Sequence, residues 1–326
     1  MTFFLRIATV LFALTTIVAA RAEPPKLKVT LLGTAGPEYF PDRSGISTLV
    51  EANGEKLLFD VGPGTNQRLY QSGVNPKDIS KIFLTHLHSD HIGGLPDLWM
   101  TPWFLLGRDH GLTLWGPDGS AQMIDGMRKM YGHDLEARVN KFNPIENLEI
   151  KVHIISDGVV FDQNGVKVTA FTVEHADGNP AFGYRIDCSG HSVVLSGDTT
   201  LNENVIKYGT GADLIVHNVI AFSDRLSAMP EMKGVLAKLT TPEQAATVFE
   251  RAKPKYAVYS HIVTKEMQGK QGEDQIIART RAAGYGGPLV MGLDRMSFEI
   301  SDDVKMIEPP SLEKLPNLDS KGQVFP

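Results

Sequence analysis

The chain has 326 residues, of which 42% are hydrophobic and 21% are charged. This composition is ordinary for a globular protein and excludes the disordered and fibrous classes. The formal net charge of −6 argues against broad electrostatic attraction to nucleic acid, so nucleic acid is not expected as a partner.

Residues 1–22 have the layout of a secretory signal peptide. Arg6 precedes an uncharged apolar stretch over residues 7–20, and Ala20-Arg21-Ala22 predicts cleavage after Ala22. The alternative is a membrane anchor, but the stretch is shorter than the ~20 residues that a spanning helix needs. We therefore expect a secreted or periplasmic protein in which residues 23–326 form one domain without a membrane span.

Cys188 is the only cysteine, so no intramolecular disulfide can form. Its position in a strand-like run before Ser189-Gly190 favours a packed thiol over a metal ligand. Stability must then come from the hydrophobic core and from any bound metal.

Short strands separated by turn signals are expected in the first part of the chain. Length and β-branched content predict strands over residues 27–32, 45–51, 56–61 and 81–85. Residues 65–72 are expected to form a helix that ends at Gly73, and residues 94–106 a Trp-rich helical segment.

Two hairpins are predicted in the middle of the chain. Asn164-Gly165 interrupts the run 159–173, and Ser189-Gly190 interrupts the run 184–195. Because hairpins join antiparallel strands, this part of the sheet is expected to be antiparallel.

Helices and strands alternate again after residue 200. Helices are expected over residues 202–208 and 241–252, and strands over residues 213–219, 256–260 and 288–291. Thr241 at the N-cap, Pro242 in the first turn and Gln244 form a complete helix start signal. Mixed sheets interleaved with helices in two similar halves predict an α/β/β/α sandwich.

Residues 86–91 place four good metal ligands within six residues, directly after a predicted strand. At strand spacing His86 and His88 would point the same way, and the following turn would bring Asp90 and His91 toward the same point. Imidazole nitrogens and carboxylate oxygens are the ligands that zinc prefers in hydrolytic sites. The alternative is a polar turn with capping residues, but the density of the pattern favours a metal site that can serve two ions.

In its sequence context this cluster resembles that of the metallo-β-lactamase-fold hydrolases, and the resemblance covers nearly all of residues 26–300. The family's later metal residues are matched by His175, Asp198 and His261. The resemblance implies an α/β fold, the metallo-β-lactamase α/β/β/α sandwich with two mixed β-sheets. It also implies two Zn²⁺ ions, with Mn²⁺ or Fe²⁺ as alternatives, whose ligands are His86, His88 and His175 for one ion, Asp90, His91 and His261 for the other, and Asp198 as the bridge.

Four further segments are similar to the ribonuclease Z and arylsulfatase-like branch, namely residues 31–36, 58–62, 90–96 and 212–217. Asp60 in the second of them either accepts a hydrogen bond from a ligand histidine or caps the following helix. Three departures argue against RNA processing. Asn218 follows His217 where ribonuclease Z proteins typically have Glu, Leu239 stands where they have a helper His, and no basic glycine-rich arm is present.

The resemblance implies a dinuclear zinc hydrolase that cleaves phosphate or sulfate esters of small molecules through a metal-bridging hydroxide, and the signal-peptide pattern predicts that it is exported. Asp90 is expected to orient the attacking water, and His217 is the candidate proton donor for the leaving group. Alternatives are an acyl hydrolase of lactones or β-lactams, a ribonuclease Z-like phosphodiesterase, and a noncatalytic metal-binding protein. The resemblance also implies a homodimer. The aromatic cluster after the metal motif forms either a pocket wall or core, and it comprises Trp99, Trp103, Phe104 and His110.

Overall fold

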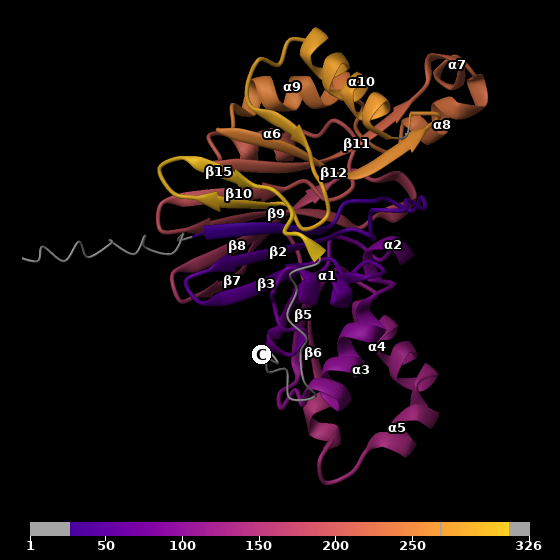
Figure 1. Ribbon diagram of the computed structural model, residues 1–326, viewed down its shortest axis with the longest axis vertical. Helices are drawn as coiled ribbons and strands as arrows, with labels where there is room; N and C mark the ends of the chain where they lie inside the picture. The colour runs from indigo at the N-terminus through magenta and orange to yellow at the C-terminus, as the bar shows by residue number, and fades with distance from the viewer. Residues whose placement is uncertain (1–26, 268, 313–326) are drawn as a thin grey trace, which may run out of the picture.

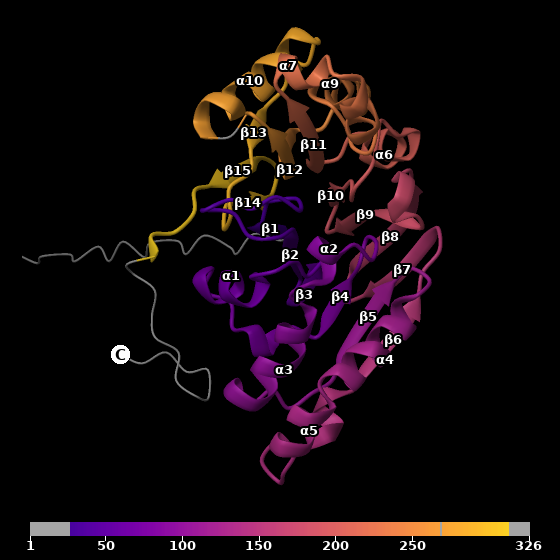
Figure 2. The same cartoon turned by 90° about the vertical axis from the view of Figure 1, so that its right-hand side faces the viewer.

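Two mixed β-sheets face each other, and helices cover their outer faces (Figures 1 and 2). The computed structural model describes residues 27–267 and 269–312, so the predicted signal peptide lies outside the described residues. No helix within those residues is long and apolar enough to cross a bilayer.

The first sheet has eight strands in the order β15-β14-β1-β2-β3-β4-β5-β6. Pairing is antiparallel from β15 to β3 and parallel from β3 to β6. The strand bounds are β1 Leu27–Gly33, β2 Ser47–Ala52, β3 Glu55–Phe59, β4 Lys81–Phe83, β5 Leu112–Gly116, β6 Ile150–Ile154, β14 Ser297–Ile300 and β15 Val304–Ile307.

The second sheet has seven strands in the order β13-β12-β11-β10-β9-β8-β7. Pairing is antiparallel from β7 to β10 and parallel from β10 to β13. The strand bounds are β7 Gly158–Gln163, β8 Val166–Val173, β9 Ala181–Cys188, β10 His191–Leu195, β11 Leu214–Phe222, β12 Tyr256–Lys265 and β13 Leu289–Met291.

The helices fall into two groups along the chain, one for each sheet (Figure 2). Those that belong to the first sheet are α1 Thr65–Gln71, α2 Ser89–Ile92, α3 Leu95–Leu106, α4 Ser120–Met130 and α5 Gly132–Arg138. Those that belong to the second are α6 Glu203–Gly209, α7 Asp224–Ser227, α8 Lys233–Leu236, α9 Pro242–Ala252 and α10 Gly269–Ala282.

The hydrophobic core between the sheets contains a stack of aromatic rings. Phe83 stacks on Trp115 with their ring centroids 4.7 Å apart, and Phe59 stacks on Phe83. From the opposite sheet, the Tyr184 hydroxyl donates a 2.6 Å hydrogen bond to the Leu84 carbonyl. Full burial of such side chains stabilises the fold by roughly 1.5–3 kcal/mol each. The core therefore fixes the end of β4, directly before the histidine cluster, against the second sheet.

Both predicted hairpins are confirmed. Asn164 and Gly165 have φ of 51° and 73°, and Ser189 and Gly190 have φ of 53° and 85°. Two successive residues with positive φ are what a two-residue hairpin turn requires. The capping box of Thr241 and Gln244 at the start of α9 is also present.

Two strand ends differ from the prediction. β4 ends at Phe83 rather than at residue 85, because the Thr85 N–H donates to the Asp60 carboxylate instead of to a neighbouring strand. His86 and His88 consequently lie in a loop and not at strand spacing. β12 runs to Lys265 rather than to residue 260, past a register shift opposite Asn218.

Trp99 and Trp103 are almost fully buried in the core between α3 and the first sheet. Their indole N–H groups donate to the Leu148 and Pro144 carbonyls. Of the two alternatives for this aromatic cluster, the structure therefore supports the core for both tryptophans.

Candidate metal centre

The structure brings all seven predicted ligand side chains together at one end of the two sheets. The ligands of the cluster follow β4 and enter α2, whereas His175 follows β8, Asp198 follows β10 and His261 lies within β12. Within each of three groups the ligand atoms lie within 4.8 Å of one another. These groups are His86, His88 and His175; His86, His91 and Asp198; and Asp90, His91 and His261.

Asp198 lies between the two predicted ion positions. Its Oδ2 is 3.1 Å from His261 Nε2 and 3.7 Å from His175 Nε2, and its Oδ1 is 3.5 Å from His91 Nε2. His261 Nε2 is also 3.1 Å from Asp90 Oδ2. Contacts to both groups are what a bridging carboxylate requires.

The buried atoms without a hydrogen-bond partner include three of the centre: His86 Nε2, His91 Nε2 and Asp198 Oδ1. Buried polar atoms in native proteins are almost always paired, so these three call for a ligand of positive charge. Nitrogen and carboxylate donors in this number suit divalent zinc. The residues present therefore fit two divalent cations.

Hydrogen bonds at the Nδ1 atoms of three ligand histidines determine which ring nitrogen can bind a metal. The Nδ1–H of His91 donates to Asp60 Oδ2 at 2.8 Å, and the Nδ1–H of His175 donates to the Lys238 carbonyl at 3.1 Å. His86 Nδ1 is 3.0 Å from Thr85 Oγ1. Each bond keeps a proton on Nδ1, which leaves Nε2 free to bind a metal.

Asp60 is therefore an acceptor for a ligand histidine. It accepts from the Thr85 N–H and hydroxyl as well as from His91. The alternative role as a helix cap does not apply, because the N-cap of α1 is Gly64 and the helix has no side-chain cap. Asp60 adopts a φ of 56°, which is uncommon for a residue other than glycine and indicates that its surroundings hold it there.

Electrostatic interactions within the centre oppose the effect of burial. Burial alone would raise the pKa of Asp198, but His261 and His91 hold it well below its usual range. Burial alone would lower the pKa of His91, but Asp198 and Asp60 raise it well above the usual value. Burial and the neighbouring His91 together lower the pKa of His86. The carboxylates thus favour a positive charge on the His91 ring, and metal binding at Nε2 would displace the proton that this atom carries in the charged form.

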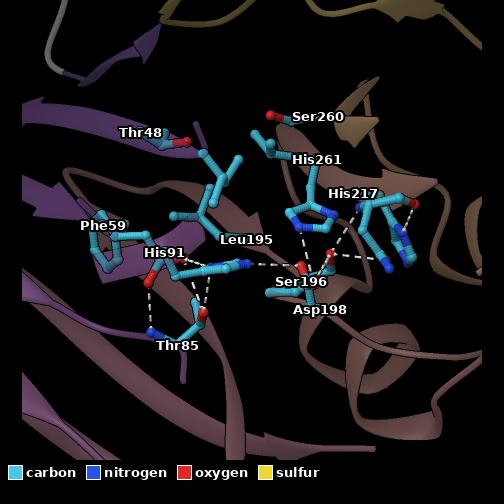
Figure 3. A pocket seen from close by; sticks show the side chains of 15 residues that line it. Thr48, Phe59, Thr85, His91, Leu195, Ser196, Asp198, His217, Ser260 and His261 are labelled. Carbon is cyan, nitrogen blue, oxygen red and sulfur yellow. Dashed lines mark hydrogen bonds and ion pairs between the residues drawn. The ribbon is translucent and has the colours of Figure 1, made fainter. Parts of the chain in front are cut away.

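His217, the predicted proton donor, lies on the other side of these ligands. It is fully buried and lines a small cavity between the sheets together with Asp198 and His261 (Figure 3). Its Nδ1–H donates to the Asn218 carbonyl, and its ring meets Phe249 edge-on. Burial lowers its pKa to about 4, so it is uncharged at neutral pH. His217 does not line the pocket that reaches the surface, and its role as the proton donor for the leaving group stays a prediction.

A second, open pocket reaches the centre from the surface, with a volume of about 300 Å³. Asp90 lines it, as the predicted role in orienting water requires. Its ligand residues are His88, Asp90, His175, Asp198 and His261; the other residues that line it are Pro37, Glu38, Asp177, Ile220, Val235, Lys238, Leu239, Val263 and Lys265.

Sequence reasoning missed the charged residues of this pocket. Lys238 pairs with Asp177 at 2.8 Å, and Lys265 lies 3.9 Å from Glu38. Glu38 Oε2 is buried without a hydrogen-bond partner, and burial raises the pKa of this carboxyl. These residues come from separate segments with no shared motif, so no local signal could have identified them.

The two residues that replace ribonuclease Z residues, Asn218 and Leu239, each have a structural role here. The Asn218 side chain donates to the Thr199 carbonyl and its backbone N–H donates to Ser196 Oγ, which fixes the turn that carries Asp198. Leu239 replaces a helper histidine and contributes an apolar side chain to the open pocket.

Comparison with known proteins finds one matching family, and relatives and solved structures that share the fold. Residues 27–233 match the family described as Anti-Pycsar protein Apyc1. The ribonuclease Z of Mycobacterium marinum is 34% identical over 284 residues, which cover 84% of this chain and 99% of that protein. The metallo-β-lactamase-fold protein YhfI from Bacillus subtilis has a TM-score of 0.64 at 18% identity, covering 83% of this chain and 98% of its own. The short form of human tRNase Z has a TM-score of 0.62 at 23% identity, covering 87% and 100%. The predicted sandwich fold is thereby confirmed.

Proposed function

The chain belongs to the Anti-Pycsar protein Apyc1 family and to the ribonuclease Z branch of the metallo-β-lactamase superfamily, and we propose that it hydrolyses phosphodiesters. It is a metal-dependent hydrolase of ester bonds. The observation that carries the proposal is the convergence of the seven ligand side chains, five of which line one open pocket.

Two zinc ions in this centre would activate a water molecule and offset the charge that develops on the ester oxygens. The protein supplies the remaining requirements. Asp60 and the Lys238 carbonyl orient His91 and His175, and Asp198 fixes the distance between the two ligand groups. Asp90 lines the pocket beside His261, where its carboxylate can orient a water molecule toward the substrate.

The relatives named ribonuclease Z argue against the sequence-based expectation that nucleic acid is not a partner. An RNA phosphodiester therefore belongs among the substrates to be tested, beside the small esters that we expected. Export and a homodimer rest on the N-terminal pattern and on family resemblance, and we retain both as proposals. Recovery of a chain that begins at Glu23 from the periplasm would support export, and an uncleaved cytosolic chain would contradict it.

The test uses purified zinc- or manganese-loaded protein with four substrates. These are bis(p-nitrophenyl) phosphate, p-nitrophenyl sulfate, a lactone and an RNA with a 3′ extension. We expect chelator-sensitive hydrolysis of at least one phosphodiester. Lactone hydrolysis without hydrolysis of either phosphodiester would overturn the proposal.

A pair of variants links the activity to the centre. We expect Asp198→Ala to lose bound metal and to reduce kcat by about a thousandfold or more, because its carboxylate contacts both ligand groups. Asp162→Ala is the control, since this exposed carboxylate is neither among the ligands nor in the lining of the pocket. Undiminished turnover by Asp198→Ala with both metals retained would contradict the assignment.

A further inference from the structure

One side of the open pocket is an apolar wall, which we define as Ile220, Val235, Leu239 and Val263. Three of these side chains are almost fully buried by the protein, at 1% exposure for Ile220, 5% for Leu239 and 4% for Val263. The same pocket contains the ligand residues His175, Asp198 and His261, so the wall and the metal centre share one cavity.

The wall belongs to a small hydrophobic cluster separate from the main cores. Phe222, Leu226, Met232 and Leu236 complete this cluster behind the wall. It forms where α7, α8 and the residues that follow them lie against the ends of β11 and β12 (Figure 1). The cluster supports the wall from behind, so the wall is part of the fold and does not depend on a ligand for its shape.

Backbone hydrogen bonds fix the wall relative to the metal centre. The Ile220 N–H donates to the Thr240 carbonyl at 2.9 Å, and the Thr240 hydroxyl donates to the Thr199 carbonyl at 2.7 Å. Next to Leu239, the Lys238 carbonyl accepts the Nδ1–H of the ligand His175. One short segment thus orients a ligand histidine through its backbone and presents Leu239 through its side chain.

The charged groups at this pocket are arranged in pairs of opposite sign. Lys238 pairs with Asp177, and Lys265 lies near Glu38. The charges of these four side chains cancel, so outside the metal centre the pocket has no excess of positive charge to attract a long polyanion. Selectivity must then come from the contact of one substituent with the apolar wall, because apolar area removed from water is the favourable term that remains.

We propose that the apolar wall is a subsite for one compact apolar or aromatic substituent of the ester, bound beside the phosphoryl group. The proposal rests on the proposed phosphodiesterase function and names the class of substrate for it. A pocket of about 300 Å³ is at the lower limit of ordinary small-ligand sites. It therefore suits a single ring system rather than an extended chain.

The test compares two inhibitors that share a phosphonate head group and differ in the apolar group, phenylphosphonate and methylphosphonate. We expect the inhibition constant of phenylphosphonate to be about tenfold lower for the wild-type protein, because the ring adds apolar area that the wall can bury. Leu239→Ser should remove most of this advantage. Methylphosphonate should inhibit the wild type and Leu239→Ser equally, and both should hold the same amount of metal.

Leu236→Ser is the matched control. Leu236 belongs to the same hydrophobic cluster but does not line the pocket. Leu236→Ser should therefore lower the stability of the fold as Leu239→Ser does, without removing a contact to the inhibitor. We expect it to retain the preference for phenylphosphonate. Equal inhibition of the wild type by the two phosphonates, or equal loss of the preference in both variants, would overturn the subsite.

The proposed function fails independently of this result. If the protein bound metal and hydrolysed a phosphodiester but showed no preference for the phenyl group, the subsite alone would be wrong. If it hydrolysed no phosphodiester, the proposed function would be wrong even where phenylphosphonate bound more tightly to the metal-loaded protein in calorimetry.

Discussion

Asp60 is the carboxylate that orients His91, and its effect on metal binding can be measured directly. In Asp60→Asn the side chain keeps its shape but loses the charge that faces the His91 Nδ1–H. We expect zinc affinity to fall by roughly 10- to 100-fold, as is typical when a partner of a ligand histidine is removed. Competition with a chromophoric chelator measures this affinity.

Asp213→Asn provides the matched control for this prediction. Asp213 is also a buried carboxylate, and it accepts from the Ser192 N–H and pairs with Lys255. It contacts no metal ligand, so stability should fall while zinc affinity stays at the wild-type value. Wild-type zinc affinity in Asp60→Asn would show that His91 does not depend on Asp60.

The buried imidazole of His217 predicts a pH-dependent stability. Burial lowers its pKa to about 4 in the folded protein, against about 6.5 in an unfolded chain. The fold therefore favours the neutral form, and this contribution is complete above pH 6.5 and is lost as the pH falls toward 4. We expect the free energy of unfolding of the metal-free protein to decrease over this window.

His217→Gln should reduce that decrease, because glutamine does not take up a proton. Denaturant unfolding of both proteins in the presence of a chelator gives the comparison, and the other buried histidines contribute equally to each. Identical pH dependence of the two unfolding free energies would show that His217 is not held neutral by the fold.

At the scale of single elements, α9 owes its start to local sequence. The Thr241 hydroxyl accepts from the Gln244 N–H, and the Gln244 side chain accepts from the Thr241 N–H. Thr241→Ala removes the first of these bonds and should lower the free energy of unfolding by about 1 kcal/mol. Thr247→Ala, at an exposed position within the same helix, should leave it nearly unchanged. Equal effects of the two substitutions would contradict the capping role.

Elements that depend on interactions between neighbouring residues were predictable from the sequence. The Asn164-Gly165 hairpin and the capping box of Thr241 depend on residues within four positions of each other, and both are present. The end of β4 was not predictable, because it depends on Asp60, which lies 25 residues before Thr85. The continuation of β12 past residue 260 was not predictable either, because His261, with a φ of 45°, lies at a register shift between β11 and β12.

The residues of the candidate site also fall into those that the sequence predicted and those that it did not. The metal ligands were predictable because their residue types and order form a dense and specific pattern. Glu38, Lys238 and Lys265 were not, since each becomes part of the pocket only when separate loops meet over the centre. His217 has a residue type suited to catalysis, but only the fold shows that it is enclosed between the sheets.

At the scale of the whole molecule, the metal centre joins the two sheets. The loop after β4 of the first sheet supplies His86, His88, Asp90 and His91, whereas His175, Asp198 and His261 come from the second sheet. The chain has a single cysteine, Cys188, which is buried and has no second cysteine to form an intramolecular disulfide with. Bound metal is therefore the cross-link available to this chain.

Removal of metal should therefore lower the stability of the entire fold. A ligand that binds only the folded state at 1,000 times its Kd stabilises it by about 4 kcal/mol, and we expect a chelator to remove a contribution of this order. Thermal unfolding with and without chelator measures the change as a lower Tm. Asp198→Ala, which should lose its bound metal, is the control, and its Tm should not respond to chelator. An unchanged Tm of the wild-type protein after verified metal removal would show that the two sheets are held together by their apolar core alone.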